Sequence, residues 1–93
     1  MKLPKKWADL GWKEDSFGKP QDCFKRIINE HTQQIVMYSS YIVHGHNKPR
    51  WRALQYNYRN PIPFIGDIHF ATMDQAFEFL VKVAEGKTKW KVQ

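Results

Sequence analysis

Residues Thr72 to Gly86, with the sequence TMDQAFEFLVKVAEG, carry the clearest structural signal in this chain of 93 residues. Thr72 and Gln75 form a Thr-x-x-Gln capping box, which satisfies two backbone N–H groups at the start of a helix. Gly86 tolerates the left-handed conformation that commonly ends one. The apolar residues between them recur at intervals of three and four, as on one buried helix face: Met73, Ala76, Phe77, Leu80, Val81 and Ala84. The pattern predicts a helix from Met73 to Glu85 that packs by this face.

Three segments before this helix have the composition of strands. They span residues 34–44, 50–58 and 64–70 and are rich in Ile, Val, Phe and Tyr. Two turn-like sequences separate them, His46-Asn47-Lys48-Pro49 and Asn60-Pro61-Ile62-Pro63. In the third segment, alternation puts Phe64, Ile68 and Phe70 on one face and Ile65, Asp67 and His69 on the other. We expect an antiparallel three-stranded sheet with the helix packed across it.

Residues 20–33 admit two interpretations. Phe24, Ile27, Ile28 and His31 keep helical spacing, and Asp22 stands near the start of such a helix. Alternatively, residues 23–29 form a strand that pairs with residues 35–43 through a polar turn at residues 30–34, which adds a fourth strand. We slightly prefer the helix. The predicted class is therefore α+β: a small antiparallel sheet of three or four strands packed against one C-terminal helix, with a second short helix near residues 20–33 in the preferred interpretation.

Length and composition predict a single domain over residues 1–93. We expect an irregular arm at residues 1–19, a sheet and helix core at residues 34–86, and a basic tail at residues 87–93. The apolar side chains expected to pack from the arm are Trp7, Leu10, Trp12 and Phe17. From the tail, Trp90 is a further candidate for packing.

The cellular compartment is inferred from cysteine content and from apolar runs. Cys23 is the single cysteine, so an intrachain disulfide cannot form. The sequence has no apolar run long enough for a signal-peptide core or for the roughly 20 residues of a membrane span. We expect a cytoplasmic protein without a membrane partner.

Charge is distributed unevenly along the chain, which carries a formal net charge of +6. Between Glu30 and Asp67 there is no acidic residue, and the basic residues of that stretch are interleaved with aromatic ones. Such a surface suits a polyanion, because cations bind phosphates and planar rings stack on bases. If the helix covers Trp51 and Ala53, the opposite sheet face exposes Arg50, Arg52 and Tyr56, together with Tyr41 or Tyr38. The predicted nucleic-acid-binding residues are Lys48, Arg50, Arg52, Tyr56 and Arg59, with Lys89 and Lys91 from the tail.

Part of the chain resembles a known family. The run Trp51-Arg52-Ala53, followed by the segment from Ile65 to Phe77, is similar to the second and third strands and the helix start of the AP2 DNA-binding domain and the related arm-binding domain of tyrosine integrases. The resemblance covers roughly residues 35–86. It implies a three-stranded sheet backed by one helix, with the outer sheet face in the major groove of DNA. The positions that it implies as core are Ala53, Phe70 and Ala76, and those that it implies as DNA-facing are Arg50, Arg52, Leu54 and Tyr56.

The sequence offers little for catalysis or metal binding. His44-Gly45-His46 does not have a zinc-site spacing, the glycines do not form a phosphate loop, and Cys23 lacks an activating sequence context. We expect no enzyme activity, no cofactor and no metal.

Two functions remain open from the sequence. The first is a small DNA- or RNA-binding accessory protein of a phage or mobile element. The alternative is a phage-type inhibitor or adaptor, of the anti-CRISPR or anti-restriction class, that binds a host protein or protein–nucleic-acid complex. The aromatic residues available for a protein interface are Trp7, Trp12, Tyr38, Tyr41, Trp51 and Trp90.

Overall fold

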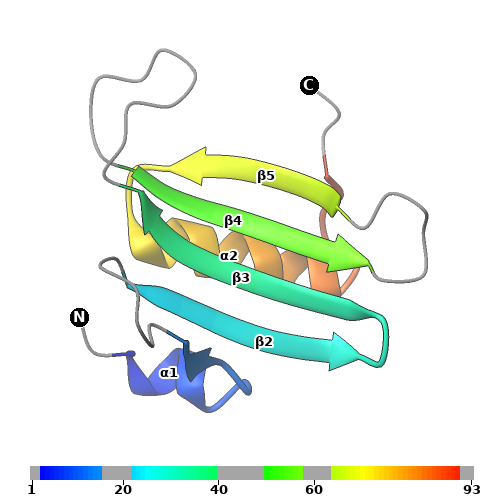
Figure 1. Cartoon of the computed structure of the whole chain (residues 1–93), viewed down its shortest axis with the longest axis horizontal. Helices are drawn as coiled ribbons and strands as arrows, with labels where there is room; N and C mark the ends of the chain where they lie inside the picture. The colour runs from blue at the N-terminus through cyan, green and yellow to red at the C-terminus, as the bar shows by residue number, and fades with distance from the viewer. Residues whose placement is uncertain (1–2, 16–21, 40–49, 58–63, 91–93) are drawn as a thin grey trace.

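The fold is a five-stranded antiparallel sheet with two helices (Figure 1). A computed structural model describes residues 3–15, 22–39, 50–57 and 64–90. Its elements are α1 (Lys5–Ala8), β1 (Lys13–Glu14), β2 (Cys23–Asn29), β3 (Thr32–Ser39), β4 (Arg50–Asn57), β5 (Phe64–Phe70) and α2 (Met73–Ala84). The strands lie side by side in chain order. The α+β class is confirmed, but the sheet has five strands where three or four were predicted.

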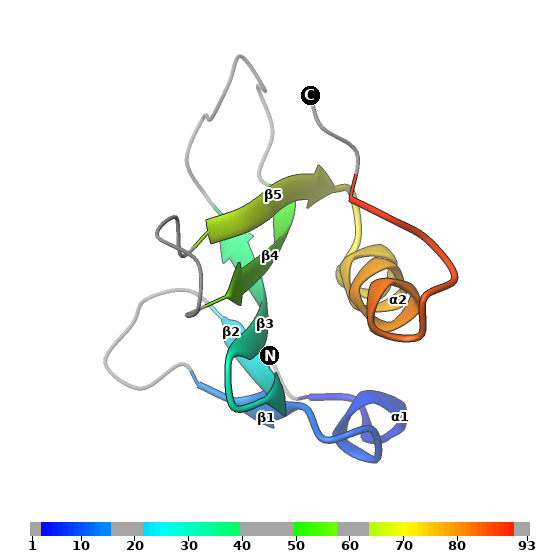
Figure 2. The same cartoon turned by 90° about the vertical axis from the view of Figure 1, so that its right-hand side faces the viewer.

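Both helices lie on one side of the sheet, as the edge-on view in Figure 2 shows. We call the other side the outer face, and in Figure 1 this face points toward the viewer. Cross-strand register and alternation assign to it Lys13 of β1, Cys23, Lys25 and Ile27 of β2, Gln33, Ile35 and Met37 of β3, Arg52, Leu54 and Tyr56 of β4, and Asp67 and His69 of β5. No helix covers the outer face among the described residues.

The helix α2 forms where its capping box predicts. Thr72 Oγ1 accepts a hydrogen bond from the Gln75 backbone N at 3.2 Å, and Gln75 Oε1 accepts one from the Thr72 backbone N at 3.2 Å. Gly86 has a φ of 75°, in the left-handed region that favours glycine. The packing face is correct except at Ala84, which lies one turn beyond the buried Leu80 and is exposed.

The predicted helix near residues 20–33 is wrong, and the alternative strand is correct. β2 pairs with β3 along its length, with Phe24 opposite Val36. The turn between them is tighter than expected, and Asn29 Oδ1 accepts a hydrogen bond from the His31 backbone N at 2.8 Å. As a strand, this segment buries Phe24 under α2 and places the residues beside Phe24 on the opposite face of the sheet. A helix here would leave β3 as an unpaired edge strand. Pairing over the whole strand therefore outweighs the local helical spacing.

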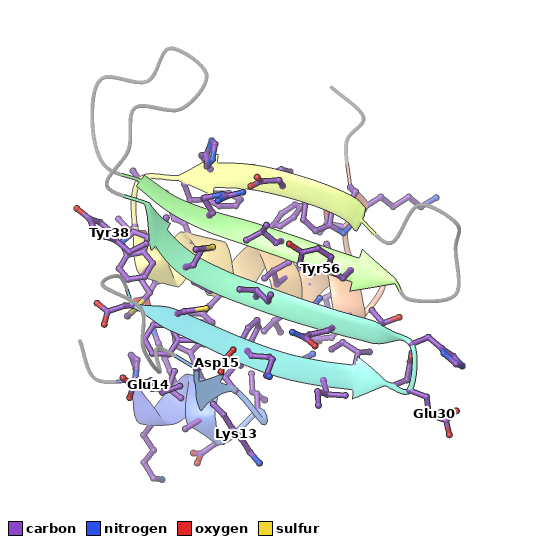
Figure 3. All side chains as sticks on the ribbon, in the orientation of Figure 1. Lys13, Glu14, Asp15, Glu30, Tyr38 and Tyr56 are labelled. Atoms are coloured by element: carbon purple, nitrogen blue, oxygen red, sulfur yellow. The ribbon has the colours of Figure 1, made fainter. Side chains whose placement is uncertain are left out.

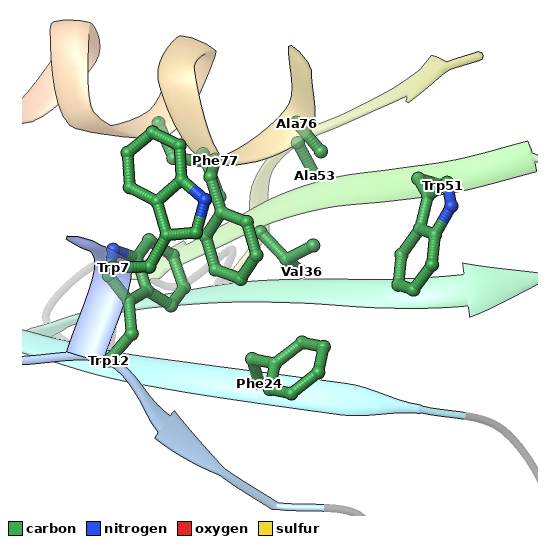
Figure 4. Packing of buried hydrophobic residues seen from close by; sticks show 9 residues of the cluster. Trp7, Trp12, Phe24, Val36, Trp51, Ala53, Ala76 and Phe77 are labelled. Atoms are coloured by element: carbon green, nitrogen blue, oxygen red, sulfur yellow. The ribbon is translucent and has the colours of Figure 1, made fainter. Parts of the chain in front are cut away.

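The core lies between the sheet and the helices (Figure 4). Phe77 of α2 is at its centre, with its ring centroid 5.0 Å from that of Trp7 and 4.8 Å from that of Trp12. The other buried members are Phe24, Val36, Trp51, Ala53, Ala76 and Leu80. Phe70, which the AP2 resemblance also implies as core, is partly buried and packs against this cluster.

The N-terminal arm is more ordered than predicted, because it contains α1 and β1. Trp7 and Trp12 are buried as expected, and Trp7 Nε1 donates a hydrogen bond to Asp74 Oδ1 at 3.0 Å. Leu10, in contrast, is 48% exposed, because it lies in the turn between α1 and β1. Phe17 lies outside the described residues. The structure thus joins the start of the chain to the first turn of α2.

The chain after α2 folds back onto the helix-covered side of β5. Trp90 packs edge-on against Phe79, with ring centroids 4.9 Å apart. A Cβ placed on Gly66 of β5 would lie 2.3 Å from Trp90 Cε3, so only a glycine permits this approach. Trp90 therefore packs, as the sequence suggested.

One polar side chain, Gln34, is buried completely within this apolar layer. Its Nε2 donates to the backbone carbonyl of Leu80 in α2 and to Gln55 Oε1 on β4, each at 2.9 Å. These hydrogen bonds connect the middle of the sheet to α2, and no sequence pattern indicated them.

Candidate nucleic-acid interface

The side chains of β4 point alternately toward the core and toward the outer face. Trp51 and Ala53 point toward α2 and are 7% and 0% exposed, so α2 covers them as predicted. Arg52, Leu54 and Tyr56 alternate with them onto the outer face. Leu54 is nevertheless buried, flanked by its register partners Ile35 and Asp67.

Arg52 is not a free cation. Its Nε donates to Asp67 Oδ1 at 3.3 Å, and its Nη2 forms a second hydrogen bond to Asp67 Oδ2. The side chains of Arg52 and Asp67 are only 28% and 19% exposed. This two-bond geometry is the strong form of an arginine–carboxylate pair. The guanidinium that the sequence assigned to phosphate binding is therefore committed to a structural ion pair.

His69 extends this cluster on β5. It lies opposite Arg52 in the register, and its Nε2 is 3.8 Å from Asp67 Oδ1. The pair His69 and Asp67, expected from strand alternation, is thus present on the outer face beside Arg52. Because the three side chains are mostly buried, this part of the outer face offers little free charge to a ligand.

The accessible cations of the outer face lie at its other end, on β1 and β2. Lys13 and Lys25 are directly opposite each other in the β1–β2 register. With Gly11 and Ile27 they line a surface hollow of about 260 Å³. Ile27 is 70% exposed, which is unusual for a large apolar residue on a strand. We define the outer-face patch as Lys13, Lys25, Ile27 and Tyr56.

Tyr56 belongs to the same row of the sheet as Ile27. The register places Ile27 opposite Gln33 and Gln33 opposite Tyr56. Figure 3 shows Tyr56 on the viewer's side of the sheet and Lys13 beyond β2 at the edge. Tyr56 is partly buried, so one portion of its side chain reaches the surface.

The arrangement of Lys13 and Lys25 opposes stability. Like charges directly opposite each other on one sheet face are destabilising. Asp15 offsets part of this repulsion, because its Oδ2 lies 3.7 Å from Lys25 Nζ. Lys13 is exposed. An anion bound to either lysine would reduce the repulsion.

Two more cations near the arm are engaged with tryptophans. The Arg26 guanidinium lies 5.7 Å from the Trp12 ring centroid, and its burial lowers the pKa of Arg26, while the charge of Glu85 raises it in part. Lys6 lies 5.0 Å from the Trp7 ring centroid and 3.2 Å from Asp74 Oδ2. Both residues stabilise the contact of the arm with the core.

Most of the remaining predicted site residues have side chains outside the described part of the structure. Arg50 pairs through its backbone with Ser39, and its side chain lies outside the described part of the structure. Lys48, Arg59 and Lys91 lie outside the described residues, as does Tyr41. Lys89 is exposed beside Trp90, on the helix side. Tyr38 also differs from expectation, because it packs on Trp51 on the helix side, with ring centroids 5.2 Å apart.

Sequence reasoning missed Lys13 and Lys25. The strand interpretation of residues 23–29 contained the signal for Lys25, because it places Lys25 and Ile27 on one face. Lys13 had no such signal, because β1 is only two residues long.

Most of the net charge lies outside the described elements. The segments 1–2, 16–21, 40–49, 58–63 and 91–93 contain Lys2, Lys19, Lys48, Arg59 and Lys91 and no Asp or Glu, so they hold five of the six net positive charges. The described residues are nearly charge-balanced.

The chain was also compared with known proteins. No family model, no curated protein and no solved structure matches it. Among the described residues, no group of three His, Cys, Asp or Glu side chains could hold a metal ion. No helix in the described part of the chain is long and apolar enough to cross a membrane.

Proposed function

We propose that this protein is a small non-enzymatic nucleic-acid-binding protein that contacts its partner through the outer-face patch. The proposal rests on one observation above all, the placement of Lys13 directly opposite Lys25 beside a surface hollow. Two lysines opposite each other destabilise the fold and attract an anion. Stability alone therefore does not explain why both are present. Conflicts of this kind are expected at functional sites.

The chemistry of the outer-face patch suits a polyanion. Each lysine ammonium is a compact cation that can bind a phosphate oxygen. The Tyr56 side chain supplies a planar ring on which a base can stack. The net charge of +6 on the whole chain attracts phosphates at longer range.

The test is fluorescence anisotropy of labelled DNA and RNA, titrated with the protein at about 50 and 200 mM salt. The double substitution Lys13→Ala and Lys25→Ala should weaken binding and lower the slope of log affinity against log salt by about 1.4 to 1.8, the value for two phosphate contacts. Its effect on stability should be small, because it removes both the repulsion between the two lysines and the weak ion pair of Lys25 with Asp15.

The matched control is Lys5→Ala with Lys82→Ala, which removes the same charge from exposed positions on the two helices. If both double variants lose affinity equally, net charge rather than the outer-face patch controls binding, and the proposed site is wrong. If the folded wild-type protein does not bind DNA or RNA at low salt, the proposed function is wrong.

Asp15 provides a test in the opposite direction. Its carboxylate competes with a phosphate for Lys25, at a distance of 3.7 Å. Asp15→Asn should therefore tighten binding by a few-fold, as expected for one exposed charge. Glu78→Gln, which removes an exposed carboxylate from α2, should have a smaller effect.

A protein partner is the second candidate function, and exposed Ile27 favours it. β1 pairs with β2 only at Lys13 and Glu14, so among the described strands the rest of β2, including Ile27, has a partner on one side only. An inhibitor or adaptor could use this edge to add a strand from another protein. Failure of nucleic-acid binding at low salt would direct the next experiment to this candidate.

A further inference from the structure

We infer that the nucleic acid bound at the outer-face patch is single-stranded, lying across the sheet, and that the sheet does not enter the major groove of a duplex. This inference depends on the proposed function and specifies its partner. It follows from the width of the sheet, from the hollow beside Ile27 and from the position of Tyr56.

The width of the sheet argues against groove insertion. Neighbouring strands lie about 4.8 Å apart, so the patch, which extends from β1 to β4, spans three spacings or about 14 Å. The major groove of B-DNA is about 12 Å wide and admits a helix or a two-stranded ribbon. A sheet of three strands would span only about 10 Å. A patch that extends over four strands therefore changes which polymer fits, because Lys13 and Tyr56, at its two ends, are farther apart than the width of one groove.

A single strand has no such restriction. Its bases are unpaired and can turn toward a protein surface, whereas the bases of a duplex are stacked inside it. An antiparallel sheet face that presents cations and an aromatic side chain can then bind phosphates and bases in alternation.

The hollow beside Ile27 is small and partly apolar, as a site for a single base would be. Its volume is about 260 Å³, below the usual range of roughly 300 to 1,000 Å³ for drug-sized ligands. The exposed Ile27 side chain gives it an apolar wall, and Lys13 and Lys25 stand on its rim. A base against Ile27 would lie beside the side chains of Lys13 and Lys25, which line the same hollow.

Tyr56 extends this site along the row. Ile27 and Tyr56 are two strand spacings apart, or about 10 Å, with Gln33 between them. A single nucleic-acid strand that crosses the sheet perpendicular to β2, β3 and β4 contacts both side chains. Gln33 lies under its path, between the two side chains.

The experiment compares three labelled probes by fluorescence anisotropy at low salt: oligothymidylate, oligouridylate and a DNA duplex, each of about 20 nucleotides or base pairs, longer than the roughly 4 to 16 nucleotides of known sheet-type sites. We expect at least one single strand to bind about tenfold more tightly than the duplex. Equal or tighter binding of the duplex would overturn this inference and leave the proposed function standing. Absence of binding to all three probes would overturn the proposed function itself.

Variants at Tyr56 and Ile27 test which side chains contact the single-stranded nucleic acid. Tyr56→Ala should weaken binding of the preferred single strand by roughly five- to a hundredfold, the usual effect of losing one stacking ring. Tyr56→Phe keeps the ring and should bind as wild type, which separates stacking from any change in folding. Ile27→Ala should also weaken binding, whereas Leu10→Ala, the matched change at an exposed apolar residue outside the patch, should not. Unchanged affinity in both Tyr56→Ala and Ile27→Ala would overturn the proposed path of the strand.

Discussion

The contact between Gly66 and Trp90 makes a sharp prediction about stability. In Gly66→Ala, the new Cβ would lie 2.3, 2.6 and 2.7 Å from three ring atoms of Trp90. These distances are far below van der Waals contact, and the nearest atoms belong to a rigid indole ring. The ring must therefore leave its place between β5 and Phe79. We expect the substitution to act almost entirely by displacing Trp90.

The size of the effect follows from the burial of the indole. A tryptophan side chain buries 150–250 Å² when fully enclosed, or about 4–6 kcal/mol at about 25 cal/mol per Å². Trp90 is partly buried, which reduces this to roughly 2–3 kcal/mol. Its Nε1 is buried without a hydrogen-bond partner in the described structure, which costs about 1 kcal/mol. Gly66→Ala should thus lower the free energy of unfolding by about 1–2 kcal/mol.

A double-mutant cycle checks the mechanism. Urea unfolding followed by far-ultraviolet circular dichroism would be measured for wild type, Gly66→Ala, Trp90→Ala and the double variant. Trp90→Ala should cost about as much as Gly66→Ala, and Gly66→Ala should cost nothing in the Trp90→Ala background. There it could even stabilise by up to about 1 kcal/mol, because alanine suits a strand interior better than glycine. If Gly66→Ala lowers the free energy of unfolding by the same amount in the wild-type and Trp90→Ala backgrounds, the steric argument is refuted.

Three further substitutions test other contacts of the fold. Thr72→Ala removes the N-cap of α2 and should cost about 1 kcal/mol by chemical denaturation, while Thr72→Ser should be nearly neutral. Hydrogen bonds from Trp7 and then Lys6 lower the pKa of Asp74 below 3.8, so its stabilisation is present above that pH and lost as the pH falls. Asp74→Asn should therefore be less stable than wild type at about pH 7, and thermal unfolding should show the difference shrinking below about pH 4. Arg52→Ala should cost about 1–2 kcal/mol, because it leaves the Asp67 carboxylate without its partner, and an unchanged melting temperature would contradict this.

The parts of the fold that local sequence determines could be predicted. α2 carries its own capping box, apolar face and terminal glycine, so its bounds follow from residues within one segment. The face assignment of β5 was correct at the four residues from Asp67 to Phe70, because Asp67 and His69 alternate with Ile68 and Phe70 regardless of the partner strand. The predicted faces of Phe64 and Ile65 concern side chains outside the described part of the structure.

The parts that depend on distant partners could not. Residues 23–29 satisfy both helical and strand spacing, and only pairing with β3 decides between them. The arm is ordered by a contact between Trp7 and Asp74, which are 67 residues apart. Arg52 looked like a free cation because its carboxylate partner, Asp67, lies 15 residues away on the next strand.

The same limit explains the change in the candidate site. Counting charges along the chain identified residues 31–66 as the most basic stretch, yet the described cation within it, Arg52, is neutralised by a residue just beyond its end. Lys13 and Lys25 come from a stretch with nearby acidic residues and look unremarkable in sequence. They form a pair only because β1 and β2 are adjacent.

In the proposed mechanism, long-range attraction of the nucleic acid and direct contact with it depend on different charges. On the outer face, Lys25 and Arg52 each have a carboxylate partner, so the face itself carries little excess charge. The chain as a whole carries a net charge of +6 and can attract a polyanion over roughly a Debye length, about 8 Å at physiological salt. Contact then requires a phosphate to replace Asp15 beside Lys25. Because Arg52 is bound by two hydrogen bonds and Lys25 by one longer ion pair, the exchange is easier at Lys25. The bound single-stranded nucleic acid should therefore be centred on β1 and β2, with Tyr56 at the far end of the binding site.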